Sequence, residues 1–200
     1  MRPKAELMLL GFGLCLLTAC GPDPVPKPKG YFRIDLPAKA YTTWTPACPF
    51  TAEIPVYAKA LPGNRPDQRC WYNLTFPDQR AIVHMTYREV HSDLAQLIED
   101  AHSYKSKHEA KAVKISTERI LRDSVRVFGN VFDVEGDVAS PLVFYMTDST
   151  AHFLYGALYF SSEPNADSLA PVTTRLREDL RHFVGTLRWS CVPSPSWPEQ

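Results

Sequence analysis

The six histidines are the side chains of this 200-residue chain best suited to bind a metal ion or to carry a proton. A zinc protease places two histidines four residues apart on a helix with a glutamate between them, and no pair here has that spacing. His102 and His108 are six residues apart at the end of a predicted helix, a spacing that suits solvent better than a shared metal. We therefore predict no metal site among His84, His91, His102, His108, His152 and His182.

Motifs for nucleophilic, phosphate and redox chemistry are also missing from the sequence. There is no Gly-x-Ser-x-Gly elbow, and no glycine-rich loop that could cradle a phosphate. Cys48 and Cys70 are too far apart for the Cys-x-x-Cys spacing of a redox motif. We therefore expect a protein that is not an enzyme and that needs no cofactor.

One polar group remains to be weighed, in the two segments on either side of a predicted strand over residues 151–160. Asp148 and Ser149 precede this strand, whereas Asn165 and Asp167 follow it. About ten residues of strand separate the two segments by roughly 30 Å, too far for one active site. Either these side chains stabilise turns and cap the next helix, with Asp167 or Ser168 as the cap, or one of the segments contacts a partner.

The N-terminus has the pattern of a lipoprotein signal. Arg2 and Lys4 precede an apolar run over residues 7–17, which is shorter than the roughly 20 residues of a membrane-spanning helix. The run leads into Leu17-Thr18-Ala19-Cys20, which is similar to a bacterial lipobox. We predict that residues 1–19 are a signal peptide and that Cys20 is lipidated, which would anchor the protein to a membrane. Residues 20–29 are then a proline-rich linker.

The charge of the predicted mature chain excludes one class of partner. Without Arg2, Lys4 and Glu6 the chain carries 20 basic and 21 acidic residues. There is no basic excess of the kind that binds nucleic acid. We therefore expect no nucleic-acid partner, and a single globular domain over residues 30–190 followed by a tail over residues 191–200.

Three further cysteines lie outside the predicted signal peptide and lipobox. Export would place Cys48, Cys70 and Cys191 in a compartment where disulfides form. We favour a disulfide between Cys48 and Cys70, which flank one loop. The alternatives are a bond between Cys191 and one of them, or three buried thiols.

Alternating apolar residues predict a series of β-strands along the chain. Gly156, in the middle of the strand over residues 151–160, indicates that another backbone or a large ring packs close to it. Residues 61–69 are expected to form a loop. The predicted strands cover residues 31–36, 50–54, 70–76, 81–87, 113–121, 125–134, 138–147 and 151–160, with a short one over 186–190.

Two helices complete the prediction. Ser92 and Asp93 are suited to cap the first, whose apolar stripe runs from Leu94 to Tyr104. The second is expected near Pro171 and carries apolar residues at helical spacing up to Leu187. Because strands follow strands along the chain, we predict an α+β fold, a mostly antiparallel sheet flanked by helices. The order of elements also resembles the PsbP/Mog1-type sandwich.

Several segments resemble the GldD family of gliding-motility lipoproteins of the Bacteroidetes. The resemblance extends from the lipobox to about Trp189. The segments that carry it are Gly30-Tyr31-Phe32-Arg33-Ile34-Asp35-Leu36-Pro37, Cys48-Pro49-Phe50, Cys70-Trp71-Tyr72-Asn73, Ala139-Ser140-Pro141, Phe144-Tyr145-Met146-Thr147-Asp148-Ser149, His152-Phe153-Leu154-Tyr155-Gly156-Ala157-Leu158-Tyr159-Phe160 and Pro164-Asn165-Ala166-Asp167-Ser168-Leu169-Ala170-Pro171-Val172.

The resemblance implies a role in gliding motility and in the associated type IX secretion machinery. It also implies that the protein acts together with other gliding-motility lipoproteins, GldJ above all. No catalytic residues are implied by the resemblance. We therefore expect a non-catalytic adaptor in the cell envelope, with the outer membrane and a periplasmic domain as the favoured location and the inner membrane as the alternative. The other function to consider is a lipoprotein that binds a small ligand or a lipid in a cleft between sheet and helices.

Overall fold

The computed structural model describes residues 36–63, 70–106, 111–163 and 165–190, and these belong to one compact unit. The predicted signal peptide, Cys20, the linker, Cys191 and the C-terminal tail lie outside the described residues. So does the strand predicted over residues 31–36, except for Leu36, which is not in a strand.

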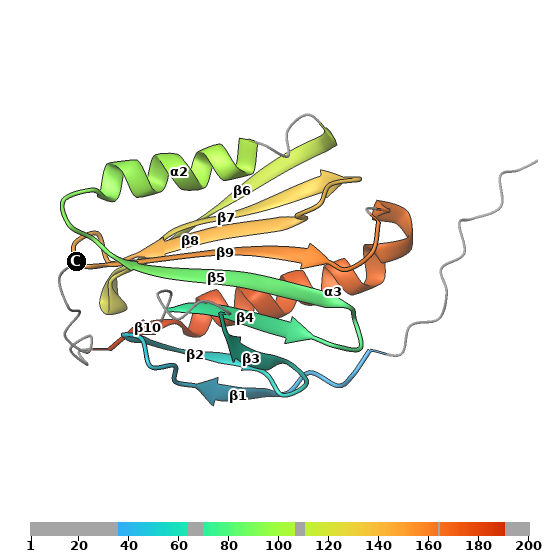
Figure 1. Ribbon diagram of the computed structural model, residues 1–200, viewed down its shortest axis with the longest axis horizontal. Helices are drawn as coiled ribbons and strands as arrows, with labels where there is room; N and C mark the ends of the chain where they lie inside the picture. Colours follow the sequence, from blue (N-terminus) through green and yellow to red (C-terminus); the bar gives the residue numbers. More distant parts are fainter. Residues whose placement is uncertain (1–35, 64–69, 107–110, 164, 191–200) are drawn as a thin grey trace, which may run out of the picture. The chain divides into compact units, whose positions relative to one another are not determined.

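A seven-stranded antiparallel sheet forms the centre of the fold (Figure 1). Strands β3, β4 and β5 form one antiparallel meander, and strands β6 to β9 form another. The two meanders join in the middle of the sheet, where β9 pairs with both β5 and β8. A 3-10 turn over Asp123–Val125 links β6 to β7. In spatial order the strands are β3 (Lys59–Pro62), β4 (Trp71–Phe76), β5 (Ala81–Glu89), β9 (His152–Phe160), β8 (Leu142–Thr147), β7 (Val127–Gly136) and β6 (Ala112–Arg122).

The two helices lie on opposite faces of this sheet. Helix α2 (Leu94–Ser106) packs on one face, through Leu97 and Ala101. Helix α3 (Ala166–Thr186) packs on the other, together with a small antiparallel sheet of β1 (Tyr41–Trp44), β2 (Phe50–Pro55) and β10 (Arg188–Trp189). The predicted α+β class, an antiparallel sheet flanked by helices, is thus confirmed, whereas the likeness to the PsbP/Mog1 sandwich stays a prediction.

Burial follows the position of each strand. In β5 every second residue, beginning with Ala81, is buried against α3 and the small sheet. All six residues of β8 are buried, because this strand has helical cover on both faces. The burial pattern of each strand therefore shows whether one or both of its faces are covered by other elements.

Gly156 shows why one central position has no side chain. It lies opposite Phe144 on β8 and Met85 on β5. A Cβ atom at Gly156 would lie 2.3 Å from Cζ of Phe144. The expectation that a large ring packs close to Gly156 is therefore confirmed.

The sequence-based strand boundaries needed several corrections. The strand β1 was not predicted, and the loop expected over residues 61–69 begins inside the short strand β3. The strand predicted over residues 138–147 begins only at Leu142, because Pro141 cannot donate a ladder hydrogen bond. Helix α3 begins at Ala166 and contains Pro171, so Pro171 does not mark its start.

Candidate functional site

The four candidate partner-contact residues lie beyond the two ends of β9. Asp148 and Ser149 form the turn before this strand, and Asn165 and Asp167 lie where α3 begins after it. They therefore do not form one site, as the length of the predicted strand indicated.

Asp148 stabilises its own turn. Its carboxylate accepts hydrogen bonds from the amides of Thr150 (2.9 Å), Ala151 (2.8 Å) and His152 (2.8 Å), and from the Thr150 hydroxyl (2.7 Å). Burial alone would raise the pKa of Asp148, but these donors outweigh it and lower the pKa to about 2. Since Asp148 is only 8% exposed, its side chain does not face a partner, whereas Ser149 remains exposed at the tip of the turn.

His152 has a structural role. Its Nδ1 lies 2.8 Å from the Tyr87 hydroxyl, and its ring stacks on Trp189 at 5.1 Å between centroids. The Trp189 indole in turn donates to the carbonyl of Arg126 (3.0 Å). These contacts join β5, β9 and β10 at one end of the sheet.

Asn165 is the N-cap of α3. Its side-chain oxygen accepts a hydrogen bond from the amide of Ser168 (3.0 Å), and its backbone is extended. The prediction that Asp167 or Ser168 caps this helix is therefore wrong, because the helix begins earlier than Pro171 suggested. The amide of Ala166 donates to the Asp137 carboxylate (2.8 Å), which joins the helix start to the β7–β8 connection.

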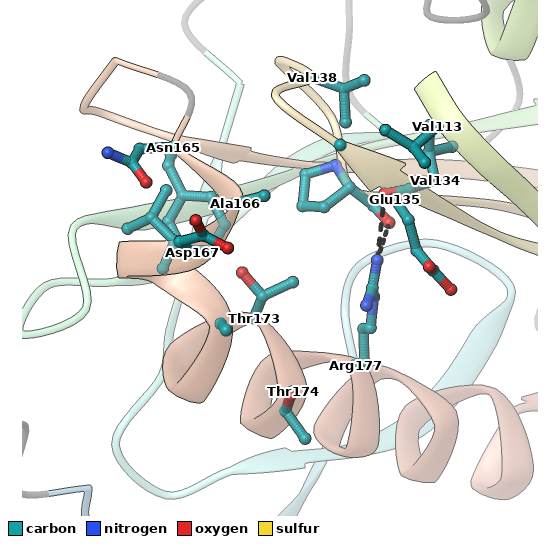
Figure 2. A pocket seen from close by; sticks show the side chains of 15 residues that line it. Val113, Val134, Glu135, Val138, Asn165, Ala166, Asp167, Thr173, Thr174 and Arg177 are labelled. Atoms are coloured by element: carbon teal, nitrogen blue, oxygen red, sulfur yellow. Dashed lines mark hydrogen bonds between the residues drawn. The ribbon is translucent and has the colours of Figure 1, made fainter. Parts of the chain in front are cut away.

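A pocket of about 380 Å³ opens beside this end of α3 (Figure 2). Its walls are largely apolar, and both Asn165 and Asp167 lie at its lining. The sequence did not indicate the pocket, because the lining comes from four segments that are far apart along the chain. Its apolar side chains include Val113, Val138, Pro141, Leu169 and Ala170.

The most prominent charged group in this pocket, Arg177, is bound to the sheet. Its guanidinium donates to the carbonyls of Val134 and Pro141, both at 3.1 Å, and its Nε lies 3.1 Å from Asp133. Arg181, one turn later, also contacts Asp133. Arg177 therefore holds α3 against β7 and β8.

A second polar cluster is buried between α3 and the small sheet. Asp179, 1% exposed, accepts hydrogen bonds from Tyr41 (2.8 Å) and Tyr57, and its carboxylate lies 3.4 Å from Nε of Arg175. Partial burial and the bond to Asp179 raise the pKa of Tyr41 to about 12, and the same causes raise the pKa of Tyr57 further. Arg175 also donates to the carbonyl of Pro37 (2.8 Å). Both tyrosines remain protonated at neutral pH, and their hydrogen bonds to Asp179 fasten α3 to the small sheet and to the segment after β2.

The sequence held one signal for this cluster that was missed. Arg175 and Asp179 are four residues apart on α3, among the apolar positions Leu176 and Leu180. Charged residues at that spacing beside an apolar stripe can pair with each other at the buried edge of the helix.

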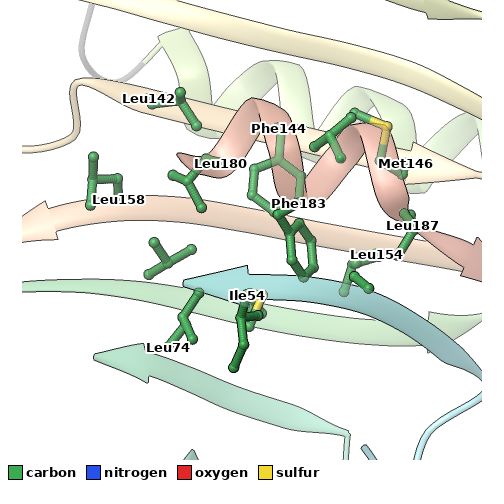
Figure 3. Close-up of a cluster of buried hydrophobic side chains, with 14 of the residues drawn as sticks. Ile54, Leu74, Leu142, Phe144, Met146, Leu154, Leu158, Leu180, Phe183 and Leu187 are labelled. Carbon is green, nitrogen blue, oxygen red and sulfur yellow. The ribbon is translucent and has the colours of Figure 1, made fainter. Parts of the chain in front are cut away.

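The interior is filled with apolar side chains (Figure 3). Phe144 and Phe183 meet between the large sheet and α3, with ring centroids 5.9 Å apart. Within the described ranges, no group of three or more His, Cys, Asp or Glu side chains could hold a metal ion.

The predicted cysteine pairing is present in the structure. Cys48 and Cys70 form a disulfide, which joins the segment before β2 to the segment before β4. Neither α2 nor α3, the helices in the described part of the chain, is long and apolar enough to cross a membrane.

Comparison with known proteins agrees with the sequence resemblance. The family model described as gliding motility lipoprotein GldD matches residues 21–189, most of the chain. No curated protein matches the chain. The chain therefore belongs to the GldD family of gliding motility lipoproteins.

Proposed function

We propose that this lipoprotein is a non-catalytic adaptor of the gliding motility apparatus and of the associated type IX secretion machinery. The family supports the motility role. The adaptor role is supported by how the reactive side chains are used: Asp148, Arg177 and Asp179 all bind neighbouring parts of the same domain. A domain that occupies such groups internally acts on others through its surface.

The lipobox supports a membrane anchor, and the outer membrane is the location that we propose for it. Lipidated Cys20 would anchor the protein in the outer membrane, and the proline-rich linker over residues 20–29 would hold the domain in the periplasm. Other gliding-motility lipoproteins, GldJ above all, are the proposed partners. Ser149, Asn165 and Asp167 are exposed and remain candidate contact residues.

Gene deletion and complementation test this function. Cells of the host bacterium without the gene should lose spreading and type IX export, and the wild-type gene should restore both. The Cys20→Ser variant should fail to restore them, whereas Cys191→Ser, a matched cysteine substitution, should succeed. Normal gliding in the deletion strain would refute the proposal.

The pocket beside α3 favours a second function, the binding of a small apolar ligand. Its volume of about 380 Å³ lies at the lower end of the range for ligand sites. Native mass spectrometry of the full-length protein would show a bound small molecule, which should be absent from an Ala170→Phe variant that fills the pocket. If neither the wild type nor the Ala170→Phe variant carries added mass, the ligand-binding function is refuted and only the adaptor role remains.

A further inference from the structure

Within the described residues, the face of the seven-stranded sheet that carries α2 is covered only in part. Side chains opposite one another on paired strands share a face, and Phe153 and Ala157 of β9 pack under α2. Following the pairing outward from β9 places three other strands on this same face. The side chains involved are Ile82, His84, Thr86 and Arg88 on β5, Trp71, Asn73 and Thr75 on β4, and Lys59 and Leu61 on β3.

Helix α2 lies over the middle of this face and not over β3–β5. Its core includes residues of β7, β8 and β9, such as Phe132, Tyr145 and Phe153. Seven strands about 4.8 Å apart span about 29 Å from first to last, whereas one helix covers about 10 Å. Room for a second helix therefore remains beside α2, over β4 and β5.

Large apolar side chains are exposed in that uncovered part. Leu61 is 49% and Trp71 42% exposed, although both belong to strands of the central sheet. Ile82 of β5 is half-buried on the same face, whereas Tyr159 packs with the residues under α2. Aromatic and aliphatic groups gathered on one surface are typical of the centre of a protein interface.

The charged side chains that β3, β4, β5 and β9 place on this face are basic. Lys59 and Arg88, both exposed, lie near opposite ends of it, and none of the residues that β3, β4, β5 and β9 place on this face is acidic. His84, between them, lies 2.7 Å from Asn73, and burial lowers the pKa of its ring, so it is mostly neutral at pH 7. Exposed Leu61 and Trp71, which lie between the two positive charges, complement an apolar stripe bordered by carboxylates.

We propose that an amphipathic helix of another polypeptide, with an apolar stripe flanked by Asp or Glu, docks on this face beside α2. The surface is a sheet face and not an edge, and α2 shows how a helix packs on that same face. Polar Asn73, Thr75 and Thr86 lie among the apolar residues, which suits a protein surface better than a lipid phase. The inference rests on the adaptor role proposed above and names the surface through which the adaptor acts.

Photocrosslinking in the host bacterium tests the kind of partner. A benzophenone amino acid replaces Leu61 in the full-length chain and, as a control, Thr43, which is exposed on β1. The residue crosslinked to position 61 is then mapped by mass spectrometry. We expect a segment with apolar residues three and four apart and acidic residues beside them. Crosslinks to lipid, a segment without this pattern, or no more product than at position 43 would overturn the proposal.

Binding of a synthetic peptide with the crosslinked sequence tests the contacts. Trp71→Ala should weaken its binding to the full-length protein in detergent by about tenfold or more, because exposed tryptophans dominate such interfaces. Arg88→Glu should weaken binding by about threefold at low salt. Arg119→Glu, on the exposed β6 at the far edge of the sheet, is the charge-matched control and should change nothing. Equal affinity of all four proteins would contradict the assigned surface.

The motility phenotype separates this inference from the function on which it rests. If the deletion strain does not glide but position 61 gives no helical crosslink, the adaptor role stands and this surface is wrong. If the helix is crosslinked but the deletion strain glides normally, the surface stands and the motility role falls.

Discussion

Asp148 illustrates how a side chain suited to chemistry can instead hold a turn. Its carboxylate binds three successive backbone amides, which fixes the chain where it enters β9. The sequence indicated a turn at this point, but it could not show that the carboxylate was buried in it. Residue type and spacing were therefore compatible with both a turn-stabilising role and a partner contact, and the burial of the carboxylate favours the turn.

Acid titration measures what Asp148 contributes. Its pKa, about 2, lies below the ordinary value of 3.8, so its stabilisation is complete above about pH 4 and is lost as the pH falls towards 2. The loss should amount to about 1–2 kcal/mol in the free energy of unfolding. Asp148→Asn should remove this part of the pH dependence in urea unfolding between pH 2 and 6, whereas Asp78→Asn, in an exposed turn, should retain it. Parallel curves for Asp148→Asn and the wild type would contradict this role.

Removal of Asp179 should strongly destabilise the fold, because it leaves charged and polar partners without their acceptor. Asp179→Ala deprives Arg175, Tyr41 and Tyr57 of their shared acceptor and should lower the free energy of unfolding by about 3 kcal/mol. The adjacent Glu178 pairs with Lys39 at the surface, so Glu178→Ala should have little effect. Chemical denaturation compares the two, and similar midpoints would show that the buried cluster contributes nothing.

Secondary structure was predictable where a strand or helix is long and regular. The alternation in β4 and β5 and the spacing in α3 gave the correct element, because one face of each is buried in the domain. The strands β1 and β3 have four residues each, too few for a pattern to be read. The start of α3 was misplaced because Pro171 is tolerated within this helix, five residues after its first.

Two glycines provide a matched test of packing between elements. Gly156→Ala would push a methyl group into the Phe144 ring and should destabilise the protein by about 1–3 kcal/mol. Gly185→Ala, within α3, meets nothing within 4 Å and should be neutral or stabilising by up to about 1 kcal/mol. Thermal unfolding distinguishes them, and Phe144→Leu should partly rescue Gly156→Ala. Equal melting temperatures for the two glycine variants would show that the close contact is absent.

The disulfide should stabilise the attachment of the small sheet. Cys48 and Cys70 are 22 residues apart, and closing a loop of that length stabilises the folded state by about 3 kcal/mol. The Cys48→Ala/Cys70→Ala double variant should unfold at correspondingly lower denaturant, and reductant should lower the wild-type midpoint to the same value. A reductant effect on the double variant would point to another bond.

The arrangement of the layers could not be predicted from the sequence. Alternation shows that a strand has a buried face, but the order β3-β4-β5-β9-β8-β7-β6 depends on contacts between residues far apart in the chain. The exposed face over β3–β5 emerges only from that order, since Trp71 and Leu61 resemble core residues when seen in sequence. The pocket beside α3 was missed for the same reason.

The two faces of the sheet should differ in local stability. In the described residues, the core under α2 contains seven buried hydrophobic residues, whereas the core shared by α3 and the small sheet contains 24. Helix α2 should therefore open without global unfolding. Hydrogen exchange should be faster for the α2 amides than for residues 172–184 of α3. Equal protection of both helices would show that the domain opens as one unit.

The disulfide between Cys48 and Cys70 makes the stability of the domain depend on the compartment in which the protein resides. Thiols stay reduced in the cytosol, so a copy retained there would lack this clasp. Such a copy unfolds more readily and is a better protease substrate than one that has reached an oxidising compartment. Proteolysis of the protein that remains in the cytosol would then prevent it from competing with the exported protein for the same binding partners.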